Sequence, residues 1–333
     1  IAREEEEGAV LLENNGGVLP LSHGSRISLF GLASYYPLYH TSSAGSRTYR
    51  NDDLTVDYKE ALEAQGFKIN ETLYNVYADV TPRTDGESSS DGTKNYMGTG
   101  NCEAPVSVYT DAVIGTFADY SDAAIVVLSR EGGEGRDMAV SERDETSGKT
   151  ISSLALHQNE RDMLELVKAH FDTIIVIINT TYFMELDWFK EYGVDAAIWI
   201  GSPGNTGLTG VAKIIDGTVN PSGRLVDTYA YDVTTAPAYW NTGDFTYTNS
   251  THQVLDPFFG AMTDTTEHFV DYAEGIYVGY RYYETRWIDN ETGLCDEDAY
   301  HAAVQYPFGY GLSYTTFAQE ITGFREENGV ISL

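Results

Sequence analysis

The sequence predicts an α/β fold, in which a mostly parallel sheet is sandwiched by helices and carries an antiparallel addition. Short apolar runs bounded by polar or Gly-rich residues are typical of strands buried on both faces. Four such runs occur, at residues 27–32, 123–129, 173–179 and 196–201. Segments with helical spacing of apolar residues alternate with them, at residues 57–65, 157–170, 183–192 and 206–216. Because parallel strands need a crossover connection, this alternation indicates a parallel sheet with helices on both faces.

The first segment of the chain is predicted to be helical. In residues 3–12 glutamates lie on one side, apolar residues follow, and Gly16, Gly17 and Pro20 end the segment. We expect the chain to enter this helix midway. Two later stretches are predicted to be long loops or insertions of the kind that shape a site on a rigid scaffold. They are residues 81–101, rich in Ser, Gly, Asp and Thr, and residues 231–271, rich in Thr, Tyr and Asn.

The C-terminal part of the chain is predicted to be rich in strands. Residues 274–284 are crowded with Tyr and β-branched residues, which favour sheet. Residues 316–324 have the pattern of a further strand, with no room for partner strands before Leu333. The sequence therefore predicts an α/β sandwich domain over residues 1–316 and the first strand of a truncated β domain over residues 317–333.

Charge and composition exclude several classes of function. A formal charge of -31 opposes a phosphate backbone or an anionic membrane, so no nucleic acid partner is expected. Cys102 and Cys295 are too few for a zinc cluster or a disulfide framework and form one bridge or none. Residues 201–207 resemble an anion-binding turn. They lack the dinucleotide glycine spacing and the P-loop lysine, so we interpret them as a strand-to-helix turn and expect no cofactor. The seven His residues show no metal-ligand spacing such as His-x-x-x-His, so no metal is expected either.

The stretch with the most chemical information follows the predicted strand at 123–128. Residues 129–137 read Ser-Arg-Glu-Gly-Gly-Glu-Gly-Arg-Asp, which puts carboxylates on a loop at the carboxyl end of that strand. In open α/β sheets, ligands usually bind at this edge. The glycines on both sides of Glu134 allow the backbone to approach a ligand closely. Glu134 is therefore a candidate proton donor.

The same residues also fit a second interpretation. In so acidic a chain, Glu131, Glu134 and Asp137 are consistent with a solvated loop that pairs loosely with Arg130 and Arg136. The residue pattern taken by itself favours this plainer interpretation.

Five segments in a fixed order give a resemblance that covers nearly the whole chain. They are Glu-Gly-Ala-Val-Leu-Leu-Glu-Asn at 7–14, the loop at 129–137, Asn-Pro-Ser-Gly-Arg-Leu at 220–225, Glu-Gly-Ile-Tyr-Val-Gly-Tyr-Arg-Tyr at 274–282 and Tyr-Pro-Phe-Gly-Tyr-Gly-Leu-Ser-Tyr-Thr-Thr-Phe at 306–317. The chain resembles the α/β sandwich domain, the second domain, of glycoside hydrolase family 3. The acid/base loop of that family reads close to Ser-Gly-Glu-Gly-x-Asp-Arg, and Met138 stands here where Arg is usual.

The resemblance implies the acid/base half of a retaining β-glycosidase, most commonly a β-glucosidase that acts on a terminal β-linked sugar. Glu134 would be the catalytic acid/base. Arg130, Glu131, Arg136 and Asp137 are then candidate substrate-binding residues. The resemblance also makes the tail at 317–333 the start of a fibronectin-like module.

The resemblance implies that the catalytic pair is completed by another domain of the same enzyme. The nucleophilic Asp of the family lies in a (β/α)8 barrel domain, in a motif of Ser-Asp-Trp type, and no barrel is present in residues 1–333. Asp187 stands in the partial match Leu-Asp-Trp, but it lies on a predicted helix between two strands, so we interpret it as a surface or helix residue. The isolated chain is therefore expected to be inactive.

A non-catalytic carbohydrate-binding or scaffold domain is the alternative from another class. Glu134 between its two glycines favours catalysis, because binding alone would not require it. The expected partners are the barrel domain and a β-glucoside or oligosaccharide, and a homodimer is left open. An extracellular or cell-surface location is favoured over a cytoplasmic one.

Overall fold

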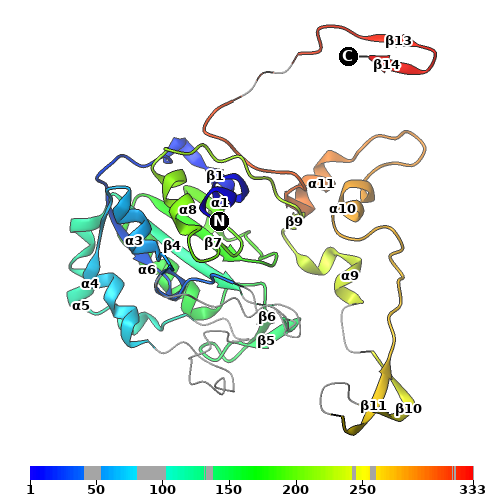
Figure 1. Ribbon diagram of the computed structural model, residues 1–333, viewed down its shortest axis with the longest axis horizontal. Helices are drawn as coiled ribbons and strands as arrows, with labels where there is room; N and C mark the ends of the chain where they lie inside the picture. The colour runs from blue at the N-terminus through cyan, green and yellow to red at the C-terminus, as the bar shows by residue number, and fades with distance from the viewer. Residues whose placement is uncertain are drawn as a thin grey trace.

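The centre of the fold is a six-stranded sheet with the strand order β1-β8-β7-β4-β2-β3 (Figure 1). The computed structural model describes residues 1–40, 54–80, 103–130, 132, 138–241, 245–255, 260–316, 318 and 320–332. The strands of this sheet are β1 (Val10–Asn14), β2 (Arg26–Phe30), β3 (Lys68–Ile69), β4 (Ala123–Arg130), β7 (Ile174–Thr180) and β8 (Ala196–Trp199). All neighbouring pairs are parallel except β1 with β8, so the predicted α/β class with an antiparallel addition is confirmed.

The central strands are buried on both faces, as their continuous apolar runs predict. Every residue of β7 is buried, and so is every residue of β4 except Ser129. Because side chains alternate along a strand, Val126 and Val176 lie in one core cluster, whereas Ile125 and Ile175 lie in the other. Each such side chain contributes about 1.5–3 kcal/mol to the stability of the fold when it is fully buried. The sheet therefore separates two hydrophobic cores.

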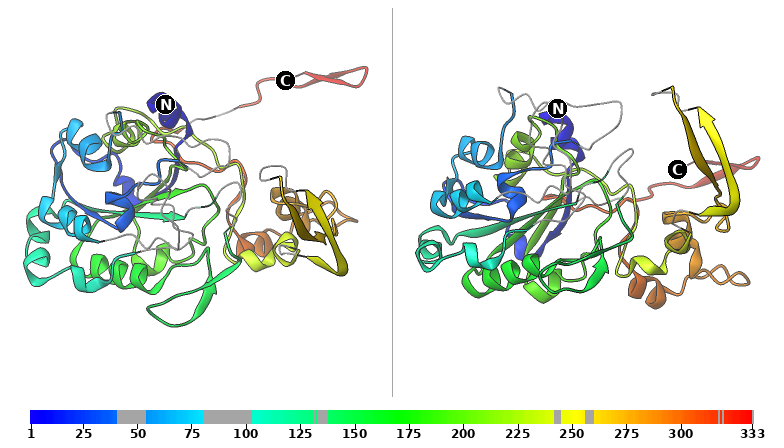
Figure 2. Two further views of the ribbon diagram at one scale, coloured as in Figure 1. Left: turned by 60° about the horizontal axis from the view of Figure 1, so that its bottom comes forward. Right: turned by 90° about the horizontal axis from the view of Figure 1, so that it is seen from below.

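Helices cover both faces of the sheet (Figure 2). The longer ones are α1 (Ala2–Gly8), α3 (Tyr58–Ala64), α6 (Gln158–His170) and α8 (Leu208–Ile215). Shorter ones are α2 (Leu32–Tyr35), α4 (Glu71–Tyr74), α5 (Asp111–Ile114) and α7 (Phe189–Tyr192). Helix α6 packs Met163, Leu164 and Val167 into one core, and α3 and α8 pack Leu62 and Val211 into the other. Three of the four predicted crossover helices are thus present nearly in full, and the fourth, at 183–192, shortens to α7.

The helix predicted over residues 3–12 is wrong in its second half. Helix α1 ends at Gly8, and β1 begins at Val10 and pairs antiparallel with β8. Val10, Leu11 and Leu12 are fully buried, because β1 forms the edge of the sheet beside β8 and its side chains alternate between the two cores. A short apolar run suits a buried helix or a buried strand equally, so its spacing does not distinguish the two.

The stretch at 231–271, predicted to be a loop, contains regular structure. It holds a 3-10 turn (Val233–Thr235), α9 (Pro237–Trp240) and the antiparallel hairpin β10 (Thr246–Leu255) with β11 (Met262–His268). The hairpin strands are exposed on both sides, which explains the lack of an alternating apolar pattern. Figures 1 and 2 show this hairpin to one side of the sandwich. The other predicted loop, at 81–101, lies outside the described residues.

The sheet predicted over residues 274–284 is also wrong. That span holds no strand and runs into helix α10 (Tyr280–Arg286), although Tyr and Val favour strands. Helix α11 (Glu297–Ala303) follows, and β12 (Val304–Tyr306) pairs with β9 (Tyr229–Ala230). Tyr283 packs with Ala230 and Val304 in a small separate cluster, which explains how the local sequence preference is overridden.

The tail differs from the expected strand at 316–324. The described residues of that span form no strand, and a hairpin of β13 (Arg325–Glu327) and β14 (Val330–Ser332) follows it. In Figure 1 this hairpin points away from the sandwich. The domain boundary at 316 and the fibronectin-like character of the tail stay predictions. Among the described residues, no helix is long and apolar enough to cross a membrane.

Candidate active site

The candidate site lies at the carboxyl end of β4. Strands β2, β4, β7 and β8 are parallel, so their carboxyl ends meet at one edge of the sheet, where ligands of open α/β folds usually bind. Arg130 is the last residue of β4 and pairs with Thr180, the last residue of β7. The predicted proton donor Glu134 follows Arg130 by four residues.

Most of the predicted site residues lie outside the described part of the chain. These residues are Glu131, Glu134, Arg136 and Asp137. Their roles stay predictions. The structure does describe Arg130, Gly132 and residues 138–241, so it shows how both flanks of the segment 131–137 are held.

The side chain of Arg130 is fully hydrogen-bonded at this edge. The residue is 1% exposed, and its guanidinium forms a two-point ion pair with the carboxylate of Glu160, at 2.7 and 2.8 Å. It also donates to the carbonyl oxygens of Ser129 (2.9 Å), Ser153 (3.1 Å) and Ala155 (2.7 Å). These five bonds equal the five N–H groups of an arginine side chain. Direct contact of Arg130 with a substrate stays a prediction, and the bonds in the structure are all internal.

Glu160 belongs to the first turn of α6, which organises the other flank of the segment. Its second oxygen accepts a bond from the backbone N–H of His157, the residue that precedes the helix, at 2.8 Å. The His157 ring lies 3.2 Å from the carboxylate of Glu142 on β5 (Ser141–Arg143). The carboxylate of Asp144 accepts from the N–H of Gln158 at 3.1 Å. The turn at 157–160 therefore contacts the chain on both sides of the segment 131–137.

A second buried carboxylate, Glu103, lies beside this ion pair, and sequence reasoning does not identify it. Its oxygens accept bonds from the backbone N–H of Leu32, at 2.9 and 3.1 Å, and of Ala104, at 2.8 Å. Burial raises the pKa of Glu103 to about 8; the backbone bonds and the charge of Arg130 oppose the rise, and the charge of Glu160 adds to it. No motif surrounds Glu103, so only the folded structure reveals it.

We expect the stability of the domain to fall as the pH rises from 4.5 to about 8, between the ordinary pKa of a Glu side chain and the raised pKa of Glu103. The pKa of this group rises from 4.5 to about 8 on folding, so between these values the folded state holds more protons than the unfolded state. Its contribution to the free energy of unfolding therefore decreases over this range, by on the order of a few kcal/mol. Urea denaturation at pH 5 and pH 8.5 measures it.

The matched variant for this pH test is Glu103→Gln, which resembles the protonated form at every pH. It should flatten the pH dependence of the denaturation midpoint. Burial also raises the pKa of Glu5 to about 7. The denaturation midpoint of Glu103→Gln should therefore still fall with rising pH, but less than that of the wild type. Parallel pH profiles for the wild type and Glu103→Gln would rule out this assignment.

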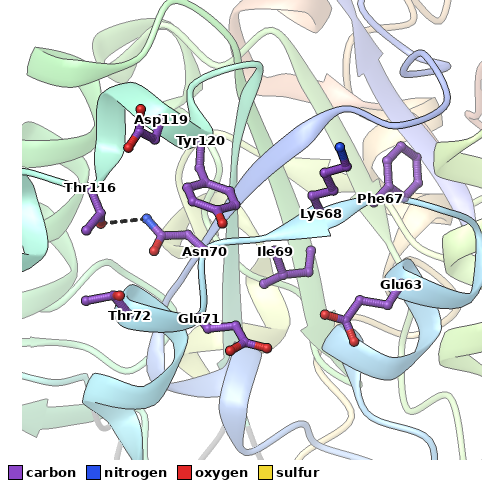
Figure 3. A pocket seen from close by; sticks show the side chains of 10 residues that line it. All are labelled: Glu63, Phe67, Lys68, Ile69, Asn70, Glu71, Thr72, Thr116, Asp119 and Tyr120. Atoms are coloured by element: carbon purple, nitrogen blue, oxygen red, sulfur yellow. Dashed lines mark hydrogen bonds between the residues drawn. The ribbon is translucent and has the colours of Figure 1, made fainter.

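A hollow of about 550 Å³ lies elsewhere, around the outer edge strand β3 (Figure 3). It is lined by Glu63, Phe67, Lys68, Ile69, Asn70, Glu71, Thr72, Thr116, Asp119 and Tyr120. Strand β3 pairs with the first residues of β2, and Tyr120 precedes the start of β4. The hollow therefore lies toward the amino ends of the strands, and we assign it no part in the candidate site.

The partial motif Leu-Asp-Trp places Asp187 at the surface of the domain. Asp187 is exposed on a turn before α7, whereas the adjacent Trp188 is buried and donates to the carbonyl oxygen of Glu185 at 2.8 Å. The interpretation of Asp187 as a surface residue is confirmed. Within the described residues, no group of three or more His, Cys, Asp or Glu side chains is arranged to hold a metal ion.

Known proteins similar to this chain include β-glucosidases that align with nearly its whole length. The chain is 30% identical to the Beta-glucosidase of Ruminococcus albus over 330 residues, which is 99% of this chain and 29% of that protein. It is 31% identical to Beta-glucosidase A of Butyrivibrio fibrisolvens over 328 residues, or 94% of this chain and 34% of that protein. The chain thus spans about a third of the length of these relatives.

Solved structures agree with the sequence relatives. The β-glucosidase of Paenibacillus barengoltzii matches with a TM-score of 0.71 and 27% identity, over 97% of this chain and 30% of that one. The β-glucosidase 3B of Thermotoga neapolitana, solved in complex with glucose, matches with a TM-score of 0.70 and 26% identity, over 98% of this chain and 39% of that one. The model of the glycosyl hydrolase family 3 C-terminal domain matches residues 9–280. The chain therefore belongs to glycosyl hydrolase family 3 and has the fold of the C-terminal domain of that family.

Proposed function

We propose that this chain supplies the acid/base half of a retaining β-glycosidase that acts on β-glucosides. The observation that carries the proposal is the family match. It is supported by the position of Arg130, the residue before the segment 131–137, at the carboxyl end of β4, the edge where ligands of open α/β folds usually bind. The β-glucosidase names of relatives that align with nearly the whole chain support glucose as the sugar.

In the proposed mechanism Glu134 serves twice. In retaining hydrolysis two carboxyl groups about 5 Å apart flank the glycosidic bond. One attacks the anomeric carbon, while the other protonates the leaving oxygen and then takes a proton from the attacking water. We assign the second role to Glu134 and the first to an Asp of a (β/α)8 barrel domain of the same enzyme. Closure of that barrel over Glu134 would exclude water and keep its carboxyl group protonated for the first step.

The residues around Glu134 have a supporting role in the proposal. Glu131, Arg136 and Asp137 would contact the substrate or set the charge around the proton donor. The family resemblance supports the barrel as a partner of this chain, because the chain spans only about a third of its β-glucosidase relatives. The expected substrate is a β-glucoside or an oligosaccharide with a terminal β-linked glucose.

Residues 1–333 produced alone are expected to fold without hydrolysing an aryl β-glucoside. The physical reason is that the chain would lack the nucleophile, and a proton donor without it gives no glycosyl-enzyme intermediate. Release of the chromogenic phenol by the purified chain, compared with a heat-denatured sample, measures the activity. A cooperative urea transition establishes that the tested chain is folded. Turnover above the heat-denatured control would show that the catalytic pair has been assigned wrongly.

A further inference from the structure

We propose that Arg130 and Glu160 are positioning residues for the segment 131–137, fixing the geometry from which its acid acts. The proposal rests on the function proposed above, because the pair would position the proton donor of that reaction. The pair joins the end of β4 to the first turn of α6, at 2.7 and 2.8 Å. Neither residue needs to touch the substrate for this role.

The burial of the pair favours a geometric role over a stabilising one. The side chains of Arg130 and Glu160 are 0% and 5% exposed. Removing two charges from water costs about as much as their attraction returns, so a buried pair adds little net stability. A two-point contact between guanidinium and carboxylate does fix relative position and orientation, because both groups are planar and rigid. The pair therefore sets where the chain leaves β4.

Arg130 also holds the connection that enters α6. Its bonds to the carbonyl oxygens of Ser153 and Ala155 join β4 to the chain between β6 (Thr150–Ser152) and the helix. The main chain of Arg130 continues the ladder with β7 as far as Thr180. One residue thus connects a strand, a neighbouring strand and the start of a helix at the point where the segment begins.

The far flank of the segment is held by the same turn of α6. Glu142 contacts the ring of His157 at 3.2 Å, and Asp144 accepts from the N–H of Gln158 at 3.1 Å. Thr146 donates to the side chain of Asn159 at 3.0 Å. Residues 157–160 therefore contact the hairpin β5–β6 after the segment as well as Arg130 before it, and they set the distance between its two flanks.

Gly132, inside the segment, provides a third point of contact. A Cβ atom at this position would lie 2.1 Å from a ring carbon of Tyr182, so the Tyr182 ring lies directly against the backbone there. Tyr182 is fixed in turn, because its N–H donates to the hydroxyl of Thr180 at 2.9 Å and that hydroxyl donates to the Tyr182 carbonyl at 2.6 Å. Since Thr180 pairs with Arg130, this contact belongs to the same arrangement.

A small displacement of a proton donor affects chiefly the step in which the proton moves. A misplacement of about 1 Å can cost on the order of 100-fold in rate. If Arg130 and Glu160 position the acid, their loss should slow cleavage most for substrates whose leaving group needs protonation. A purely structural role would instead reduce the amount of folded enzyme and leave the dependence on the leaving group unchanged.

The test compares Arg130→Lys and Glu160→Gln in the complete enzyme. Lysine keeps the charge of Arg130 without its two-point geometry, and glutamine keeps the shape of Glu160 without its charge. The measurement is kcat/KM for aryl β-glucosides of graded leaving-group pKa, corrected for active enzyme by active-site titration. We expect a loss of about 10- to 100-fold for the poorest leaving groups and about threefold or less for the best.

The matched control is Lys213→Met, which removes a second ion pair. Lys213 contacts Glu6 of α1 at 2.6 Å and lies in the last turn of α8, in an ion pair that does not include β4 or α6. Its effect should be the same for all leaving groups. The double variant Arg130→Lys/Glu160→Gln should lose no more than the worse single variant, because the two residues act as one unit.

Two results separate this proposal from the proposed function. If Glu134→Ala depends steeply on the leaving group and both Arg130→Lys and Glu160→Gln do not, the positioning role is overturned and the assignment of Glu134 stands. If Glu134→Ala shows no such dependence, the proposed function fails, and the positioning role fails with it. Should Arg130→Lys not fold, Glu160→Gln decides by the same criterion.

Discussion

Replacing Glu134 by Ala in the complete enzyme is expected to lower kcat/KM by about 10²- to 10⁴-fold for β-glucosides with poor leaving groups. The loss for activated aryl glycosides should be much smaller, because their phenolate departs almost without protonation. The measurement is a plot of log kcat/KM against leaving-group pKa, which should become steep in the variant.

Glu131→Ala is the matched control for that experiment. It removes a carboxylate three residues away, to which we assign no part in proton transfer. Its plot should keep the slope of the wild type. A steep plot for Glu131→Ala and a flat one for Glu134→Ala would exchange the two assignments.

Replacing Arg130 by Met should cause the largest loss of stability among the substitutions considered. The change leaves the carboxylate of Glu160, whose side chain is 5% exposed, without its two-point partner. Removing one partner of a buried pair costs about 3–5 kcal/mol, because a charge stays behind in a medium of low polarity. Urea denaturation of the wild type and the variant measures the difference.

Two further variants test whether that loss comes from the unpaired buried charge. Arg130→Met/Glu160→Met should recover much of it, since replacing both partners by apolar side chains is often close to neutral. Arg3→Met removes an exposed pair with Glu7, whose side chains are 87% and 65% exposed, and should leave the midpoint unchanged. A midpoint for Arg130→Met equal to that of the wild type would show that the pair is not buried as described.

The central strands could be predicted from the sequence because both of their faces are buried. A continuous apolar run such as the one in β4, bounded by polar turns, is typical of a strand covered by helices on both sides. A similar run is ambiguous at β1, because Val10, Leu11 and Leu12 directly follow a helix and fit its continuation equally well. At α10 the strand preference of Tyr and Val is outweighed by packing of Tyr283 in a small cluster, which no local pattern reveals.

The candidate site was predictable only in part for a different reason. The segment at 131–137 is visible in the sequence because its glycines and carboxylates are contiguous and match a family pattern. The partners of Arg130 are not contiguous with it, since Glu160 is 30 residues away and joins it only through the fold. Glu103 is likewise an ordinary surface-type residue until the fold buries it.

Chemical rescue of Glu134→Ala by azide tests the central claim most directly. Once an activated aryl β-glucoside has formed the glycosyl-enzyme, the variant lacks the base that activates water. Azide, a small anion that needs no base, should then restore turnover and give the β-glucosyl azide, which nuclear magnetic resonance identifies by its anomeric configuration. The account predicts this product with Glu134→Ala and none with Glu131→Ala. Equal losses for good and poor leaving groups together with no azide product would contradict it, and Glu131 would become the next candidate for the acid.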